Sequence, residues 1–268
     1  MNTEHRAVLE TFLARLRGAR ERVLALDYDG TLAPFVARRE DADLYPGIAP
    51  LLARIREQGT HIAFITGRPA PDLARRLPLT GIEIYGSHGH EYLGPDGALV
   101  QTPLEAPVRS ALERLGARIQ EAGDSRWLER KHATVAIHWR DADPRTRASL
   151  ESLAASLSAD LPAAIAVLPF DGGIEFRARG HDKGVALRSL LARHPGAVAA
   201  YLGDDHTDED AFAALPRDDL GILVRPDFRA TGARLWLRPP DELRAFLGLW
   251  ARIDAGEAPA ALAREIAR

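Results

Sequence analysis

The chain has 268 residues, of which 46% are hydrophobic and 27% charged, so it can bury one large core or a core with a smaller satellite. Its formal net charge of -3 excludes a general basic surface for nucleic acid, and no apolar run reaches the ~18 residues of a membrane span. The absence of cysteine excludes disulfides, thiolate metal sites and cysteine nucleophiles, and it fits a cytoplasmic location.

Short apolar runs alternate with helical patterns at both ends of the chain. We predict strands at residues 23–26, 62–65, 82–85, 198–202 and 221–224. Helical patterns follow at residues 47–58, 70–77, 183–193 and 208–214, and the Ala-rich C-terminal stretch is also typical of a helix. Alternating strands and helices predict an α/β fold with a Rossmann-like parallel-sheet core, formed by residues 1–104 and 179–268.

The middle of the chain has a different order of elements. Helical patterns at 107–122 and 144–159 are each followed by two strand-like segments, at 126–130 and 134–140 and at 165–169 and 174–177. This order predicts an α+β module inserted between the two halves of the core. We place the module at residues 105–178; the family resemblance described below implies that it acts as a cap domain for substrate specificity.

Four polar clusters come directly after predicted strands of the core. They lie at residues 27–31, 66–68, 86–89 and 203–205. Ligands of an open parallel sheet bind at the carboxyl ends of its strands, near a switch in strand order. We therefore expect these four segments to meet in one crevice.

The first cluster reads Asp27-Tyr28-Asp29-Gly30-Thr31. Two carboxylates two positions apart point the same way in an extended chain. One of them can attack phosphorus, and the other can protonate the leaving oxygen and then deprotonate a water. Two anions that face a phosphate require a cation, and Mg²⁺ prefers such oxygen ligands. A solvated acidic turn is the alternative, but the preceding buried-looking strand favours the catalytic interpretation.

The last cluster, residues 203–210, carries five acids in seven positions after an apolar strand. Acids complement the dipole at a helix N-terminus, but this number exceeds what capping requires. We interpret Asp204 as a metal ligand, and expect Asp205 and Asp208 to orient it or the water molecules of the metal.

Phosphate-binding groups are predicted at two further places. A hydroxyl and backbone amides at the turn of Thr66, Gly67 and Arg68 suit phosphate oxygens, although an ordinary capped turn has the same residues. The only lysine besides Lys131 is Lys183, at the start of a predicted helix, and it offers a compact point charge.

In this order, Asp-x-Asp-Gly-Thr, Thr-Gly-Arg, lysine and Gly-Asp-Asp-x-x-Asp resemble the four motifs of the haloacid dehalogenase superfamily. The resemblance covers nearly the whole chain and implies a nucleophile at Asp27 and a general acid/base at Asp29. It also implies that Thr66 and Lys183 bind the phosphoryl group. Asp27, the main-chain carbonyl of Asp29, and Asp204 would hold Mg²⁺.

Longer segments at residues 26–34, 86–91 and 203–212 are similar to the trehalose-6-phosphate phosphatase family, although Asp182 stands where that family usually has Asn. This resemblance implies a sugar-phosphate substrate, trehalose 6-phosphate, and a role in trehalose biosynthesis. It allows a functional link to a trehalose-6-phosphate synthase without indicating whether the two proteins bind. We also assign substrate contacts to Gly67, Arg68 and His88.

The inserted module carries the candidates for sugar recognition. Alternation puts Glu129 and Lys131 on one face of a strand, and His138 lies on the next strand. With Glu175 on the last strand, these side chains could pair with sugar hydroxyls, as the family resemblance suggests. The alternative is the charged, solvated face of a half-exposed sheet.

Other functions stay open at this point. A phosphatase of the same architecture could act on glucosylglycerol phosphate, mannosyl-phosphoglycerate or sucrose phosphate. A phosphomutase would return the phosphoryl group to a sugar, and a sugar-phosphate sensor would bind without catalysis. A dinucleotide-binding dehydrogenase is disfavoured because no Gly-x-Gly-x-x-Gly turn follows the first strand.

Overall fold

The structure is a computed structural model that describes residues 3–36, 41–122, 125–159, 161–170 and 172–254. The Ala-rich C-terminal stretch, for which the sequence predicts a helix, lies outside these residues. The chain divides into two compact units, one of Met1–Leu99 with Asp182–Arg268, and the other of Val100–His181. None of the helices in the described ranges is both long and apolar enough to cross a lipid bilayer.

An eight-stranded sheet has the order β12-β11-β10-β1-β2-β3-β4-β5, and all of its strands except β5 lie wholly in the first unit. Its strands are β1 (Arg22–Leu26), β2 (Thr60–Ile65), β3 (Glu83–Gly86), β4 (Glu91–Leu93), β5 (Leu99–Gln101), β10 (Val198–Gly203), β11 (Leu220–Val224) and β12 (Leu235–Leu237). The pairs from β12 through β3 are parallel, and β4 is antiparallel to β3. The predicted α/β fold with a parallel core is confirmed.

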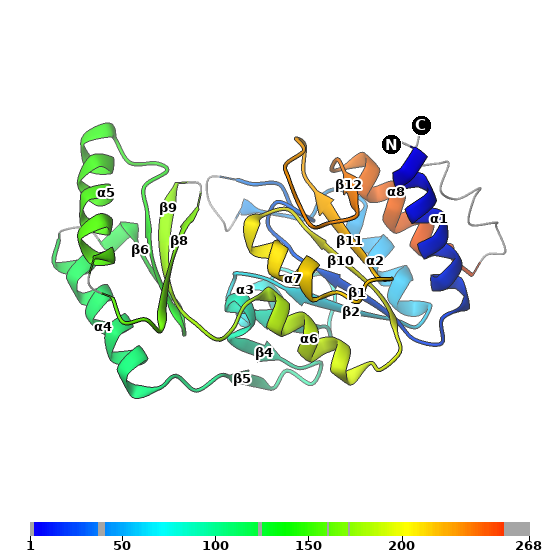
Figure 1. The fold of residues 1–268 in the computed structure, drawn as a ribbon, viewed down its shortest axis with the longest axis horizontal. Coiled ribbons are helices and arrows are strands. Elements are labelled where there is room, and N and C mark those ends of the chain that lie inside the picture. The colour runs from blue at the N-terminus through cyan, green and yellow to red at the C-terminus, as the bar shows by residue number, and fades with distance from the viewer. Residues whose placement is uncertain (1–2, 37–40, 123–124, 160, 171, 255–268) are drawn as a thin grey trace. The chain divides into compact units, whose positions relative to one another are not determined.

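Helices cover both faces of the parallel strands (Figure 1). One face packs on α1 (Thr3–Gly18), α2 (Ile48–Glu57), α3 (Ala70–Ala74) and α8 (Asp241–Trp250). The other packs on α6 (Lys183–Arg193) and α7 (Glu209–Ala214). The central strands are apolar on both faces for this reason: in β1, Leu24 and Leu26 join the first core while Val23 and Ala25 join the second.

Parallel pairing brings the carboxyl ends of β1, β2, β3, β10 and β11 to one edge of the sheet. Leu26 of β1 pairs with Leu202 of β10 on one side and with Phe64 of β2 on the other. The residues that follow these strands therefore lie along one edge of the sheet, although up to about 200 positions separate them in the sequence.

The second unit contains a four-stranded antiparallel sheet in the order β6-β7-β9-β8. Its elements are α4 (Ala106–Glu121), β6 (Leu128–Arg130), β7 (Thr134–His138), α5 (Pro144–Ser158), β8 (Ile165–Phe170) and β9 (Gly173–Ala178). Both helices pack on one face, where Val135 and Ile137 of β7 meet Phe176 of β9. The predicted order of helix, two strands, helix and two strands is present.

Two short segments differ from the predicted elements. Residues Ser125–Trp127 form a 3₁₀ turn, so the strand predicted at 126–130 begins only at Leu128. Strand β7 ends at His138, because Trp139 donates its backbone N–H to Gly172 in the facing turn. Among the described residues, Ser87–Gly89 and His206–Asp208 also form 3₁₀ turns, and both border the site described below.

Candidate active site

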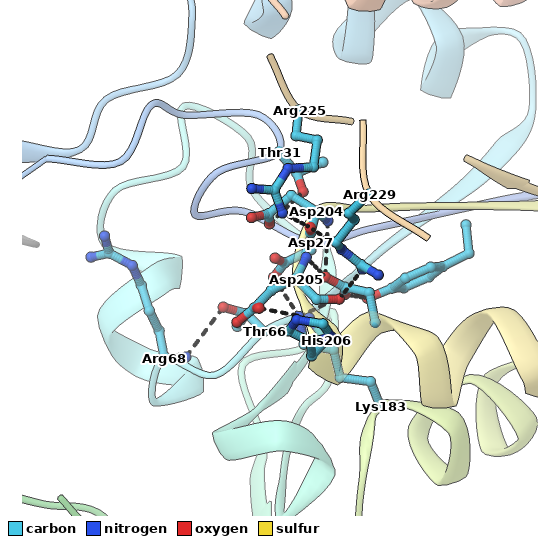
Figure 2. Close-up of polar contacts among 12 residues, drawn as sticks. Asp27, Thr31, Thr66, Arg68, Lys183, Asp204, Asp205, His206, Arg225 and Arg229 are labelled. Atoms are coloured by element: carbon cyan, nitrogen blue, oxygen red, sulfur yellow. Dashed lines mark hydrogen bonds and ion pairs between the residues drawn. The ribbon is translucent and has the colours of Figure 1, made fainter. Parts of the chain in front are cut away.

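Two buried carboxylates lie side by side at the ends of adjacent strands. Asp27 follows β1 and Asp204 follows β10, with exposed fractions of 4% and 2%. The backbone N–H of Asp27 donates to the carbonyl of Leu202 at 2.8 Å, which continues the strand pairing to the first acid. Carboxylate oxygens of Asp27, Asp204 and Asp208 lie within 4.8 Å of one another, and Figure 2 shows the first two facing the same centre.

The electrostatics of this cluster favour a cation. Burial raises the pKa of Asp27 to about 7, and the charges of Asp208 and Asp29 add to the increase while Lys183 opposes it. Burial also raises the pKa of Asp204, with Asp208 and Asp27 as further causes. Three carboxylates thus face a single buried ammonium in the described part of the chain. Their hard oxygens and their excess of negative charge fit Mg²⁺.

The third carboxylate of the cluster is fully buried and hydrogen-bonded on both oxygens. Asp208 accepts from the Lys183 ammonium at 2.7 Å and from the Tyr201 hydroxyl. Its other oxygen accepts from the backbone amides of Asp204 at 2.9 Å and Asp205 at 2.8 Å. A carboxylate has about four lone-pair positions, and here four donors use them. We therefore expect Asp208 to position Lys183 and the Asp204 turn, and direct metal ligation to fall to Asp27 and Asp204.

The neighbouring Asp205 takes part in this turn as a cap. Its side chain accepts from the backbone N–H of His206 at 2.6 Å, and its own amide completes a capping box with Asp208. The side chain is thereby turned toward the start of the 3₁₀ segment. Any contact of Asp205 with a metal stays a prediction.

Lys183 enters the cluster from the first turn of α6. The side chain of Asp182 caps this helix by accepting from the amide of Val185 at 2.7 Å. At the next position, a Cβ on Gly184 would lie 2.3 Å from the backbone oxygen of Asp210, so only glycine permits this approach of α6 to α7. The ammonium is 3.2 Å from Asp27. Burial lowers the pKa of Lys183, but Asp208 and Asp27 outweigh it and raise the pKa overall, so the ammonium stays charged.

Asp29 is held by Arg68 in this structure. The guanidinium donates to both carboxylate oxygens of Asp29, at 2.7 and 2.5 Å, in the bidentate geometry of a strong ion pair. Figure 2 shows the guanidinium directed away from Asp27 and Asp204. The general acid/base role of Asp29 stays a prediction. The predicted contact of Arg68 with substrate stays a prediction.

The predicted phosphate turn is closely packed against the segment after β3. Thr66 receives a hydrogen bond from the amide of His88 at 2.9 Å through its carbonyl, and its hydroxyl accepts from the amide of Arg68 at 3.2 Å. A Cβ on Gly67 would lie 2.8 Å from the imidazole of His88. Ser87 and His88 both adopt left-handed backbone angles, with φ of 48° and 57°, a strain often retained at functional sites. Thr66, Gly67 and His88 are therefore neighbours, as predicted.

Three residues that contact this cluster were not assigned a role from the sequence. Arg225 and Arg229 donate to the carbonyl of Asp204 at 3.3 and 3.2 Å, and Arg229 also donates to the carbonyl of Asp205 at 2.6 Å. The hydroxyl of Thr31 donates to the carboxylate of Asp204 at 3.1 Å. A signal existed for Arg225, since it directly follows β11 as the other site residues follow their strands.

The four predicted sugar contacts form one polar cluster within the second unit. Glu129 pairs in register with Ala136, which pairs in turn with Glu175, so these residues share the face of the sheet opposite its core. Glu129 contacts the imidazole of His138 at 2.8 Å and the ammonium of Lys131 at 3.5 Å. Lys131 lies 3.7 Å from Glu175 and is only 3% exposed. Side chains that were only solvated would be scattered over the sheet face, whereas these four are linked by contacts to one another.

The sequence matches a known family along most of the chain. A model of the trehalose-phosphatase family aligns with residues 25–232, from the last residues of β1 to beyond β11. The chain belongs to the trehalose-phosphatase family. The matched range includes the segments that carry the buried acids, the Thr66 turn and Lys183.

Individual trehalose-phosphate phosphatases are also similar to the chain. A trehalose-phosphate phosphatase from Mycobacterium marinum is 34% identical over 234 residues, which make up 83% of this chain and 59% of the relative. One from Mycobacterium tuberculosis is 34% identical over 253 residues, or 90% of this chain and 64% of the relative. The chain thus spans 59% to 64% of the length of these curated trehalose-phosphatase relatives.

A solved structure of this family has the same fold. The C-terminal domain of C. albicans trehalose-6-phosphate phosphatase superposes with a TM-score of 0.77 at 22% identity, covering 92% of this chain and 96% of that one. At this identity the likeness concerns the fold alone. The likeness agrees with the predicted α/β fold with a parallel core.

Proposed function

We propose that this protein is a Mg²⁺-dependent phosphatase that hydrolyses trehalose 6-phosphate to trehalose and phosphate. The observation that carries the proposal is the buried pair of Asp27 and Asp204 beside the ammonium of Lys183. A nucleophile, a cation site and a fixed positive charge thereby lie together at the carboxyl edge of the sheet. The names of the family and of its relatives support the substrate.

In the proposed reaction, the carboxylate of Asp27 attacks phosphorus, and the bond between phosphorus and the sugar oxygen breaks. After separating from Arg68, Asp29 takes up a proton from solvent and donates it to the leaving sugar oxygen. Asp29 then takes a proton from a water, whose oxygen attacks the aspartyl phosphate and releases phosphate with Asp27 regenerated. Thr66 and Lys183 bind the phosphoryl oxygens throughout.

Mg²⁺ would be held by the carboxylates of Asp27 and Asp204 and by the main-chain carbonyl of Asp29. When bound, it would neutralise charge on the phosphoryl group and on the attacking carboxylate. The hydroxyl of Thr31 and the carboxylate of Asp208, which accepts from the backbone amide of Asp204, fix the orientation of Asp204 for this role. We propose cytoplasmic activity, and a functional link to a trehalose-6-phosphate synthase, as the setting of this reaction.

The affinity for Mg²⁺ should increase with pH up to about pH 7.5. Because the pKa of Asp27 in the metal-free protein is raised to about 7, Asp27 carries a proton at lower pH that the metal must displace. Each displaced proton changes the affinity by up to about tenfold per pH unit. Calorimetric titration between pH 5.5 and 8.5, in buffers of different ionisation enthalpy, measures both the affinity and the released protons. Asp27→Asn should release fewer protons, and an affinity independent of pH would contradict the assignment.

A panel of phosphate esters tests the substrate. Phosphate release should have the highest kcat/KM with trehalose 6-phosphate, compared with glucosylglycerol phosphate, mannosyl-phosphoglycerate and sucrose phosphate. Faster turnover of one of these would replace the substrate and keep the chemistry. Transfer of the phosphoryl group to a sugar rather than to water would indicate a mutase, and binding without turnover would indicate a sensor.

Glu129→Gln should weaken sugar recognition without affecting phosphoryl chemistry. The substitution keeps the shape of the side chain but removes the charge that contacts His138 and Lys131. We expect kcat/KM for trehalose 6-phosphate to decrease by about tenfold or more. Hydrolysis of p-nitrophenyl phosphate, which has no sugar, should change less than about twofold. Substitutions outside the catalytic residues usually have effects of this size.

The matched control is Glu151→Gln on α5 of the same unit, where the side chain is exposed and pairs with Arg147. This variant should retain both activities. An equal loss of both activities in Glu129→Gln would show that Glu129 supports the fold of its sheet rather than the substrate.

A further inference from the structure

We propose that His61, Glu83 and His194 form a second metal site, of the kind that binds Zn²⁺, at the amino-terminal edge of the parallel sheet. This site is separate from the acidic cluster and does not depend on the proposed phosphatase function.

The three residues come from elements that pack directly on one another. His61 lies near the start of β2, Glu83 is the first residue of β3, and His194 follows the last residue of α6. Glu83 pairs in register with Ala63. His61, two positions earlier, points to the same face of the sheet as Ala63, which is the face that packs on α6. The fold therefore directs the three side chains to one place.

Their ligand atoms are spaced as a small metal requires. One nitrogen of each histidine and one oxygen of Glu83 all lie within 4.8 Å of one another. The Nε2 atom of His61 is 3.4 Å from Oε1 of Glu83. Two ligands at about 2.1 Å from a tetrahedral Zn²⁺ lie roughly 3.4 Å apart. The imidazole rings of His61 and His194 are close as well, with centroids 4.1 Å apart.

The nitrogen of His61 that faces Glu83 is buried and makes no well-formed hydrogen bond among the described residues. Its neighbour is Oε1 of Glu83 at 3.4 Å, a weak contact at the long end of hydrogen-bond distances. A metal ion between the two side chains would replace this weak contact by two ligand bonds.

The surroundings would hold the ligands in place. The guanidinium of Arg193 donates to the second oxygen of Glu83, which leaves the first oxygen directed at His61. Glu21 lies 3.8 Å from Nδ1 of His194 and adds a second carboxylate at the rim. The hydrogen bond from Arg193 to Glu83 is of the kind that orients ligating side chains in metal sites. Two imidazoles and one carboxylate suit Zn²⁺ better than Mg²⁺, which prefers oxygen ligands.

The position of the site indicates a structural role. A bound ion would join the start of β2, the start of β3 and the end of α6. The opposite ends of these elements lead to Thr66, to His88 and to Lys183. The metal would therefore stabilise the part of the scaffold on which the phosphate-binding residues stand.

The test is metal binding by the full chain with Mg²⁺ kept at millimolar concentration. After equilibrium dialysis against Zn²⁺, about one equivalent should remain bound, and the melting temperature should increase by about 5–10 °C at a hundredfold excess over Kd. With Co²⁺ in place of Zn²⁺, the visible absorption of a nitrogen-ligated tetrahedral ion should appear.

Variants separate this site from the acidic cluster. His61→Ala and His194→Ala should each lose the bound Zn²⁺ and the Co²⁺ spectrum, while Asp204→Asn and the control His5→Ala should keep both. Retention of Zn²⁺ in His61→Ala, loss of it in Asp204→Asn, or no binding by the parent protein would each overturn the proposal. Loss of phosphatase activity alone, with Zn²⁺ binding intact, would affect only the proposed function.

Discussion

Asp27→Asn should reduce phosphate release from trehalose 6-phosphate on the order of 10⁴-fold or more, because the amide cannot form an acyl phosphate. The fold should be retained. Burial raises the pKa of Asp27 to about 7, above its unfolded value, so at pH 8 its ionised form lowers the free energy of unfolding of the metal-free protein. Lys183 keeps its contact with Asp208 at 2.7 Å in the variant.

Steady-state phosphate release and urea denaturation at pH 8 measure the two effects separately. The free energy of unfolding without metal should be unchanged or higher in Asp27→Asn than in the parent. Glu151→Gln is the control, since its exposed side chain on α5 pairs with Arg147. If Asp27→Asn kept activity within about tenfold of the parent, the nucleophile would be misassigned.

Lys183→Met should be the most destabilising single change in the site. The ammonium is 3% exposed and contacts Asp27 at 3.2 Å and Asp208 at 2.7 Å. Its removal leaves two buried carboxylates without their cation, which costs about 3–5 kcal/mol for buried pairs of this kind. Phosphoryl stabilisation is lost too, and we expect kcat to decrease by about 10²–10³-fold.

A double variant separates the two consequences of losing Lys183. Lys183→Met with Asp208→Asn removes the unpaired charge as well as the ammonium, so part of the free energy of unfolding should return. Activity should stay low in the double variant, because the phosphoryl group still lacks its positive charge. Full stability of Lys183→Met alone, measured by urea denaturation, would show that Lys183 does not compensate these acids.

Both predictions concern a network in which catalytic and structural roles overlap. Asp208 touches Lys183, Tyr201 and the turn of Asp204, so its own substitution would disturb all of them together. Asp27 has fewer structural contacts, and its loss should therefore be mainly chemical. The difference in the free energy of unfolding between the Asp208 and Asp27 variants therefore measures how much the charge contacts of the cluster stabilise the fold.

The order of elements could be predicted from the sequence because local patterns determine it. Apolar runs bounded by Gly, Pro and acidic residues gave β1, β2 and β10 within two residues of their ends. Parallel strands place their carboxyl ends at one edge, so the meeting of Asp27, Thr66 and Asp204 followed from that order.

The sequence by itself determined the α/β core, the inserted module and the residue types available for phosphoryl chemistry. Only the tertiary structure decided which side chains pair: Arg68 with Asp29 across 39 positions, Arg225 with the carbonyl of Asp204, and His61 with Glu83 and His194. These contacts depend on strand order, on turn geometry and on the direction of each side chain. Local periodicity carries no information about any of the three, because each arises between segments distant in the chain.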